Sequence, residues 1–214
     1  IDARQRVSVV NLQDDQYAAA VASGSYELTS SDPSVAKVDG DHVIAVGDGS
    51  ASLSARFTDG RTASATVVVS GTQQPIAHSF RNDIQSILAR QGCNMGACHG
   101  ALAGKGGFRL SLRGYDSDAD YHAITREVRG RRIEIADPGK SLLLTKPTGA
   151  LPHKGGLRLD VGSRDYDVIA QWIAAGAKGP SDVDARLTHI SVLPENTSLA
   201  PGDSSQVLVN AHYS

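Results

Sequence analysis

Two thiols and one imidazole stand together in the segment Cys93-Asn94-Met95-Gly96-Ala97-Cys98-His99-Gly100. Two cysteines with a histidine directly after the second form the C-x-x-C-H pattern that attaches haem covalently. In that attachment each sulfur bonds a vinyl group of the porphyrin, and the adjacent imidazole ligates the iron. Here four residues separate the cysteines instead of two, so the loop must bulge. We expect Gly96 to supply the backbone freedom that the bulge needs.

Three other interpretations of this segment remain open on the residues alone. Cys93 and Cys98 could form a small-loop disulfide in an oxidising compartment and leave His99 without a role. The same three residues could belong to a structural zinc site, but such a site needs a fourth ligand, and the chain has no second cysteine pair. The thiols could also be free and buried. The local motif does not choose between haem and these three.

The elements around this motif are predicted to be helical. Phe80, Ile84 and Ile87 recur at helical spacing before the motif, with Ser79 as a cap and Gly92 as a stop. Three more helices are predicted: one capped by Ser117 with Asp120 and running to about Glu127, one from Asp137-Pro138 through Leu142–Leu144, and one from Ser163 to Gly176 that carries Trp172 and Ile173.

The flanking stretches have a different periodicity. Apolar residues alternate over Arg6–Leu12, Ala51–Phe57 and Ala63–Val69, which predicts half-buried strands. Turn signals such as Asp59-Gly60 separate these strands, and short strands at close spacing are typical of an antiparallel β-sandwich. The β pattern returns in Leu187–Pro194 and Gln206–Ala211. We hypothesise that these last strands pair with an exposed sheet edge of the first module, in the same or a neighbouring molecule.

Two segments carry family resemblances. Tyr26–Asp39 and Val46–Leu53 resemble bacterial Ig-like modules of group 2. Phe80–Ala177 resembles the planctomycete-type cytochrome c domain, which occurs in large exported proteins beside such modules. The matching segments are Phe80–Ile84, Cys93–Phe108, Leu110–Asp116, Lys146–Gly149 and Gln171–Ala177.

These resemblances imply a fold and its boundaries. The fold class is a mixed multi-domain chain: a β-sandwich Ig-like module, then an all-α class I cytochrome c-like domain, then the first strands of another Ig-like module. The expected ranges are 1–71 for the first module, which we expect to lack its first strand, 76–180 for the haem domain and 186–214 for the partial module. The chain is expected to be a fragment of a longer protein.

The resemblance also implies one covalent haem c per chain, held by Cys93, Cys98 and His99. Class I cytochromes place the loop with their distal ligand before the last helix, and Leu151-Pro152-His153 occupies that position. The distal ligand is therefore expected to be His153, so that His99 and His153 ligate one iron. Met95 lies between the cysteines and cannot pass round the porphyrin. The alternatives are His122, Lys154, Lys146 or an open position.

Composition excludes several classes of function. The chain has 214 residues, with Lys+Arg 21 against Asp+Glu 23, and this balance argues against a nucleic-acid-binding protein. No apolar run approaches the roughly 18 residues that span a bilayer. Neither a catalytic triad nor a paired-carboxylate or nucleotide site is recognisable. The haem propionates could be paired with cations from the set Lys105, Arg109, Arg113 and Arg158. A separate basic cluster is either a docking surface for a redox partner or a solvated helix end; it consists of Arg126, Arg129, Arg131 and Arg132.

The expected function is electron transfer by a haem c module in the periplasm or cell envelope. Its partner would be a redox protein or neighbouring domains of the same polypeptide, and the chain itself is not expected to be an enzyme. Bis-imidazole ligation predicts a reduction potential below typical His/Met values. Two alternatives stay open: a sensor or peroxidase-like site with a displaceable distal ligand, and a structural or adhesion module with a disulfide or zinc.

Overall fold

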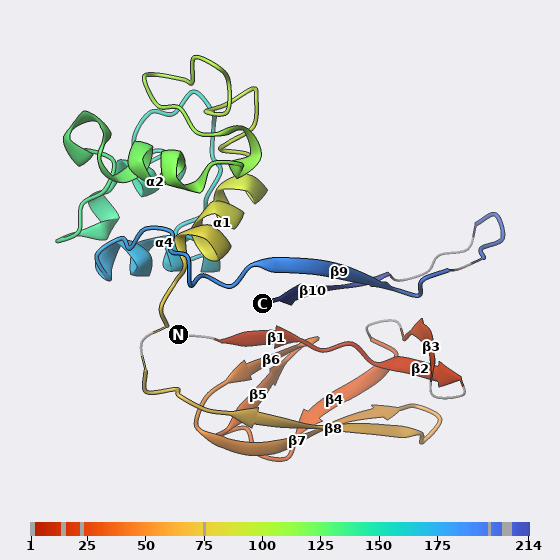
Figure 1. Cartoon of the computed structure of the whole chain (residues 1–214). Coiled ribbons are helices and arrows are strands. Elements are labelled where there is room, and N and C mark those ends of the chain that lie inside the picture. The colour runs from red at the N-terminus through yellow and green to blue at the C-terminus, as the bar shows by residue number, and fades with distance from the viewer. Residues whose placement is uncertain (1–2, 14–15, 22–23, 75, 197, 203–206) are drawn as a thin grey trace. The chain divides into compact units, whose positions relative to one another are not determined.

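The structure is a computed structural model, shown in Figure 1, which describes residues 3–13, 16–21, 24–74, 76–196, 198–202 and 207–214. The chain divides into two compact units. The first combines Ile1–Ile76 with Arg186–Ser214, and the second is Ala77–Ala185. The cysteines and the histidines that carry the chemistry lie in the second unit.

The first unit is built from short antiparallel strands. They are β1 (Arg4–Arg6), β2 (Val10–Gln13), β3 (Gln16–Ala20), β4 (Tyr26–Ser30), β5 (Ala36–Asp39), β6 (His42–Ala45), β7 (Gly49–Phe57) and β8 (Thr62–Val69). Two three-stranded sheets have the orders β1-β6-β5 and β4-β7-β8, and β2 pairs with β3. Buried side chains from both three-stranded sheets form one cluster that includes Val43, Leu53 and Val69.

Of the three alternating segments predicted to be strands, two are strands in the structure and one is not. The predicted strands at 51–57 and 63–69 are confirmed, because β7 and β8 contain them. The prediction of one strand over Arg6–Leu12 is wrong. The chain leaves its partner β6 after Val7, whose amide donates to Asp41, and Val9 already accepts from Val21 beside the β2–β3 hairpin. A change of partner ends a strand even where the alternation continues.

The end of the chain forms a hairpin. β9 (Leu187–Leu193) pairs with β10 (Leu208–Tyr213). Within the described ranges, neither strand is paired with a strand of residues 1–71. The hypothesis that they extend the first module's sheet is therefore not supported within one molecule, and the version with a neighbouring molecule stays a prediction. Gln206, the first residue of the second predicted strand, lies outside the described residues.

The second unit contains short helices joined by long turns. The elements are η1 (Phe80–Ile84), α1 (Gln85–Arg90), η2 (Leu112–Gly114), α2 (Ser117–Thr125), η3 (Glu127–Gly130), η4 (Pro138–Lys140), α3 (Leu142–Thr145) and α4 (Arg164–Ala174). No helix in the described part of the chain has the length and apolar character needed to cross a membrane.

The predicted fold class is wrong. The whole chain holds 26% strand and 23% helix in small sheets and few helices, and Ala77–Ala185 is not an all-α class I cytochrome c-like domain. The longest helix, α4, has eleven residues. Glycines with positive φ, such as Gly92 at +74° and Gly176 at +91°, follow α1 and α4 and turn the chain away from the helical path. The connections then form the walls of the site together with residues of α1, α3 and α4.

The helix starts were predicted unevenly. Ser79 and Ser163 cap their helices as expected, each accepting from a backbone amide in the first turn. The predicted capping box of Ser117 with Asp120 is wrong, because the cap of α2 is Asp116. Asp120 is instead buried, and its carboxylate accepts from the Ser111 hydroxyl at 2.8 Å and the Gln85 amide at 2.9 Å. The predicted helix from 137 to 144 is two short pieces, η4 and α3.

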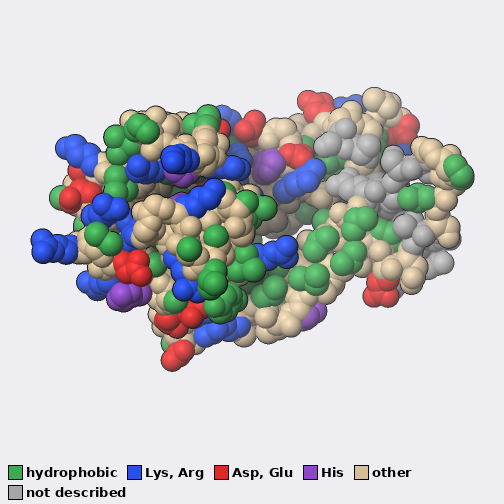
Figure 2. All heavy atoms as spheres, turned by 90° about the horizontal axis from the view of Figure 1, so that it is seen from above, with side chains coloured by type: hydrophobic (Ala, Val, Ile, Leu, Met, Phe, Trp, Pro, Cys, Tyr) green, Lys and Arg blue, Asp and Glu red, His purple; other side chains and the backbone are tan. Residues whose placement is uncertain are grey.

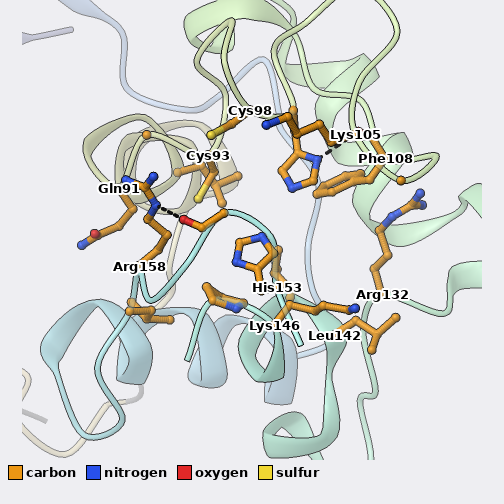
Figure 3. A pocket seen from close by; sticks show the side chains of 18 of the residues that line it. Gln91, Cys93, Cys98, Lys105, Phe108, Arg132, Leu142, Lys146, His153 and Arg158 are labelled. Carbon is orange, nitrogen blue, oxygen red and sulfur yellow. Dashed lines mark hydrogen bonds between the residues drawn. The ribbon is translucent and has the colours of Figure 1, made fainter. Parts of the chain in front are cut away.

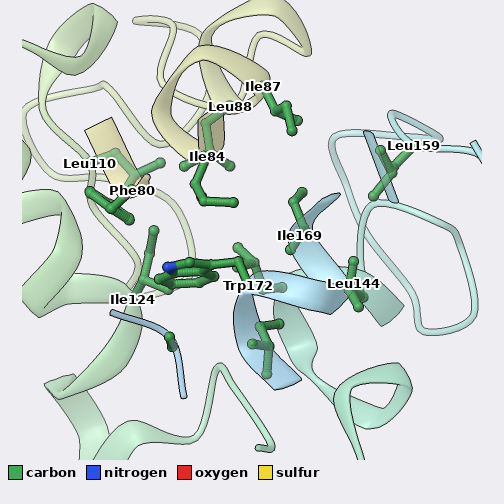
Figure 4. Packing of buried hydrophobic residues seen from close by; sticks show 13 residues of the cluster. Phe80, Ile84, Ile87, Leu88, Leu110, Ile124, Leu144, Leu159, Ile169 and Trp172 are labelled. Carbon is green, nitrogen blue, oxygen red and sulfur yellow. The ribbon is translucent and has the colours of Figure 1, made fainter. Parts of the chain in front are cut away.

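One hydrophobic core supports the second unit (Figure 4). Phe80 and Trp172 lie at its centre with ring centroids 5.6 Å apart, and both are almost fully buried. Leu88, Leu159 and Ile169 belong to this core and also line the cavity described below. The core therefore fixes the ends of the loops that carry the cysteines and His153.

Candidate functional site

A cavity of about 880 Å³ lies in the second unit (Figure 3). The four residues predicted to bind a cofactor, Cys93, Cys98, His99 and His153, all line it. They come from two loops, one after α1 and the other between α3 and α4. The structure thus brings together all four predicted site residues, although they are up to sixty positions apart in the sequence.

The cysteine loop folds back on itself. The amide of Cys93 donates to Leu88 at 2.8 Å, which joins the loop to the end of α1. The amide of Cys98 donates to Met95 at 2.8 Å, and that of His99 donates to Cys93 at 2.9 Å. This closure takes up the extra residues of the C-x4-C-H segment and leaves both sulfurs beside one cavity. Both cysteines are free thiols.

The glycine that the bulge requires is not the predicted one. Gly96 does not have positive φ, and a Cβ there would meet Leu112 at an ordinary 3.9 Å, so the expectation for Gly96 is wrong. At Gly100 a Cβ would lie 2.1 Å from the carbonyl oxygen of Asn94. The loop therefore depends on close backbone approach at Gly100 rather than on unusual dihedral angles at Gly96.

The imidazole of His99 is held in one orientation. Its Nδ1 lies 3.0 Å from the carbonyl oxygen of Phe108, which can only accept a hydrogen bond, so Nδ1 carries the proton and Nε2 keeps its lone pair. The Phe108 ring packs against the imidazole with centroids 4.5 Å apart. Burial lowers the pKa of His99 from its ordinary value of 6.5, which favours the neutral, metal-binding form.

His153 repeats this arrangement with local partners. Its Nδ1 lies 2.9 Å from the carbonyl oxygen of Gly156, so its Nε2 is also the nitrogen with a free lone pair. The Lys146 ammonium donates to the carbonyl of Pro152 at 3.0 Å and closes the loop. A Cβ at Gly155 would lie 2.7 Å from Cε1 of His153, so the glycine makes room for the ring.

The two imidazoles form a pair across the cavity. Their ring centroids lie 6.2 Å apart and their planes differ by 15°. A histidine nitrogen lies about 2 Å from a bound transition metal, so two rings on opposite sides of one ion have centroids about 6 Å apart. Neither Nε2 has a hydrogen-bond partner among the described residues. At this separation His99 and His153 could both bind one metal ion.

The remaining walls combine apolar and cationic side chains. The apolar ones include Ile87, Leu88, Leu142, Leu143, Leu159 and Ile169, and the cationic ones are Lys105, Arg131, Arg132, Lys146, Lys154 and Arg158. No Asp or Glu is among the described lining residues. In Figure 2, Lys and Arg side chains are scattered over the visible face of the second unit, among apolar and some acidic side chains. Such a cavity fits a largely apolar ligand that carries negative groups.

The thiol of Cys93 is the more strongly perturbed group of the cysteine loop. Burial raises its pKa from 9.0 to about 11. The nearby Arg158 works in the opposite direction but does not overcome burial. Cys93 therefore stays protonated at neutral pH in the chain without a ligand, and a spontaneous thiolate reaction there is disfavoured.

Other predicted residues divide into those at the cavity and those away from it. Lys146, Lys154, Lys105 and Arg158 line it, whereas His122 and Met95 are exposed and lie outside the lining. Arg109, Arg113, Arg126 and Arg129 are also outside it. Sequence reasoning missed Phe108 as the partner of His99, and it treated Arg132 as a surface residue although this side chain is buried.

Two further findings bear on identity. Within the described ranges, no group of three or more His, Cys, Asp or Glu residues could hold a metal ion, so the structural zinc interpretation finds no ligand set there. Comparison with protein-family models, curated proteins and solved structures finds no match for this chain.

Proposed function

We propose that Ala77–Ala185 is an electron-transfer module that holds one covalent haem c. The observation that carries this proposal is the pair of imidazoles from His99 and His153, each with a free Nε2, 6.2 Å apart in a cavity that two free cysteines also line. Two thiols and two opposed imidazoles are the protein groups that a bis-histidine haem c needs.

The donor set and the cavity fit this group. Cys93 and Cys98 would hold it by thioether bonds, and His99 and His153 would bind its iron. Its carboxylates would find cations in Lys105, Lys146 and Arg158, which line the cavity beside the apolar side chains. When bound, haem supplies reversible one-electron transfer at its iron.

The roles of the protein residues follow from their hydrogen bonds. Phe108 and Gly156 each accept from an Nδ1 and so keep both Nε2 lone pairs directed away from the backbone. If both imidazoles bound the iron, the proposal would include no iron site for a substrate, which favours electron transfer over catalysis. Imidazole in place of a thioether lowers the expected reduction potential relative to His/Met proteins.

The family and setting are part of the same proposal. We place the module with planctomycete-type cytochrome c domains, flanked by Ig-like segments, in an exported protein of the periplasm or cell envelope. The resemblance of Phe80–Ala177 supports this, as does the need for covalent haem attachment outside the cytosol. The electron partner would be another redox protein or a neighbouring domain, and the near-neutral charge balance disfavours nucleic acid.

The test is haem attachment to the full chain in an exporting, haem-attaching host. After denaturing electrophoresis, haem stain should stay with the wild-type polypeptide, and intact mass should increase by one haem. Cys93→Ala and Cys98→Ala should each leave one thioether and weaken retention, and the double variant should lose the stain. Export of a colourless chain with Cys93 joined to Cys98 would favour the structural or adhesion alternative.

A displaceable distal ligand is the second candidate, because the described hydrogen bonds of His153 and of Pro152 before it are made within their own loop. If this candidate is right, ferrous protein should bind carbon monoxide rapidly. Slow or absent binding would favour the electron-transfer module, in which His153 stays on the iron.

A further inference from the structure

Arg132 is a charged side chain in the wall of the cavity with only 4% of its surface exposed. Burying a guanidinium is costly unless its donors are satisfied. Nη1 donates to the carbonyl of Ala123 at 2.7 Å, and Nη2 donates to that of Gly107 at 2.9 Å. Both terminal nitrogens are therefore committed to the backbone rather than directed at a ligand.

The guanidinium of Arg132 also packs against Phe108, the hydrogen-bond partner of His99. Its central carbon is 4.5 Å from the centroid of the Phe108 ring, within the range of a cation–π contact. The Phe108 ring in turn contacts His99, and the Phe108 carbonyl accepts from His99 Nδ1. Arg132, Phe108 and His99 thus form a continuous series of contacts from the protein interior to the cavity.

The backbone that delivers Arg132 is strained. Val128 and Arg129 have φ of 52° and 59°, and Gly130 follows at 70°. The left-handed conformation is unfavourable for a β-branched residue, and such strained positions cost about 1–3 kcal/mol each. This turn reverses the chain after α2 so that Arg132 reaches back to Ala123, near the end of that helix. The strained residues Val128 and Arg129 thus lie in the segment that positions Arg132.

The charge of Arg132 is incompletely balanced. Among the described residues, Glu127 is its acidic neighbour, with Oε2 3.5 Å from Nη1, and the Glu127 side chain is partly exposed. Through the Phe108 ring, the guanidinium of Arg132 lies beside the His99 wall of the cavity. A buried positive charge near a metal site disfavours the oxidised state of the metal, which carries more positive charge.

We propose that Arg132 is a positioning residue for His99: it holds the imidazole orientation through Phe108, and its buried charge favours the reduced state of a haem at this site. The effect of the Arg132 charge on the redox state of a haem rests on the proposed function. The positioning of His99 by Arg132 through Phe108 concerns the chain's own residues and can be tested without haem.

The experiment compares the full chain with Arg132→Met, Arg132→Lys and Arg126→Met. Arg126→Met is the matched control, because it removes the same charge from an exposed residue outside the cavity lining. Nitrogen-15 NMR of haem-free protein, at a pH where imidazole is neutral, reports which nitrogen of His99 carries the proton. Redox titration of haem-loaded protein reports the charge effect, and circular dichroism checks folding.

In wild type and Arg126→Met, His99 should carry its proton on Nδ1. Arg132→Met should show both tautomers, and its equilibrium constant for reduction should fall about tenfold. Arg132→Lys should have a reduction potential close to that of wild type, because lysine keeps the positive charge. It should still show both His99 tautomers, because lysine lacks the planar guanidinium group that packs on Phe108. If Arg132→Met does not fold, Phe108→Leu should disturb the His99 tautomer and leave the potential near wild type.

A folded Arg132→Met with the tautomer and potential of Arg126→Met would overturn the inference. A single His99 tautomer in Phe108→Leu would overturn its positioning half. A wild-type chain that never retains haem would instead contradict the proposed function, and the NMR result would still decide the positioning half.

Discussion

The loops of His99 and His153 present the same chemical group in different ways. Each imidazole uses Nδ1 to contact a backbone carbonyl and leaves Nε2 free. The partner of His99 is Phe108, nine residues away, which packs against the buried Arg132. The partner of His153 is Gly156, three residues away, in a loop closed by Lys146. One candidate ligand, His99, is held by packing between distant segments, and the other, His153, is held by its own turn.

This difference indicates that the two loops contribute differently to stability and to ligand binding. The His99 side draws its rigidity from the core and should resist displacement. The His153 side has few contacts beyond its loop, so it can move with little loss of folding free energy. Substitutions should therefore affect stability mainly on the cysteine side and ligation mainly on the His153 side.

The largest expected effect is at Gly100. Gly100→Ala places a methyl group 2.1 Å from the Asn94 carbonyl oxygen, so the cysteine loop must open. We expect a loss of about 3 kcal/mol in the free energy of unfolding, measured by urea denaturation. Gly96→Ala in the same loop should be close to neutral, since its Cβ meets no atom closer than 3.9 Å. Equal stability of the two variants would show that the closed loop is not the native one.

The next effect is a pH dependence that belongs to Cys93. Its pKa rises from 9.0 to about 11 on folding, so the folded chain keeps a proton that the unfolded chain releases. This stabilisation is fully present below pH 9 and is lost between pH 9 and 11, by up to about 2 kcal/mol. Urea titrations of the haem-free chain at pH 8 and pH 11 should show a smaller loss in Cys93→Ala than in wild type. A loss of the same size in both would contradict the burial of this thiol.

A smaller and opposite effect is expected in the turn that delivers Arg132. Val128→Gly removes a β-branched side chain from φ 52° and should stabilise the chain by about 1 kcal/mol, after the entropy cost of glycine. Val161→Gly, at an exposed valine without positive φ, should destabilise it slightly. Thermal denaturation of both variants provides the measurement, and destabilisation by Val128→Gly would count against strain at this position.

The smallest effect on stability should come from the His153 loop. Gly155→Ala has acceptable backbone angles, but its methyl group would lie 2.7 Å from Cε1 of His153 and displace the ring. We expect the free energy of unfolding of the haem-free chain to change by less than about 0.5 kcal/mol. The haem-loaded variant should lose low-spin absorption. Gly139→Ala, with ordinary contacts at 3.6 Å, is the control and should keep it.

The candidate ligands were easier to predict from the sequence than the residues that support them. Cys93, Cys98 and His99 lie within one seven-residue segment, and His153 was predicted through a resemblance, so all four could be named before any fold was known. Arg132 could not, because its burial depends on a left-handed turn at Val128 and Arg129 that side-chain propensities disfavour. Asp120 was misassigned for a related reason: its position fits a helix cap, yet its partners Ser111 and Gln85 come from other segments.

The predicted fold class is wrong because the resemblance to class I cytochromes was extended from the helices to the turns between them. The apolar spacing around Ile84 and Trp172 does mark helices, but it says nothing about the long turns between them. Those turns depend on glycine dihedral angles and backbone hydrogen bonds that no periodic pattern encodes. The β stretches failed at Arg6–Leu12 in the same way, where alternation continued across a change of strand partner.

The central claim is that His99 and His153 ligate one iron from opposite sides. The most direct measurement is the electron paramagnetic resonance spectrum of the ferric, haem-loaded full chain and of His153→Ala, with His122→Ala as control. A low-spin spectrum in wild type and His122→Ala that becomes high-spin in His153→Ala is the predicted result. A low-spin spectrum that survives in His153→Ala would contradict it.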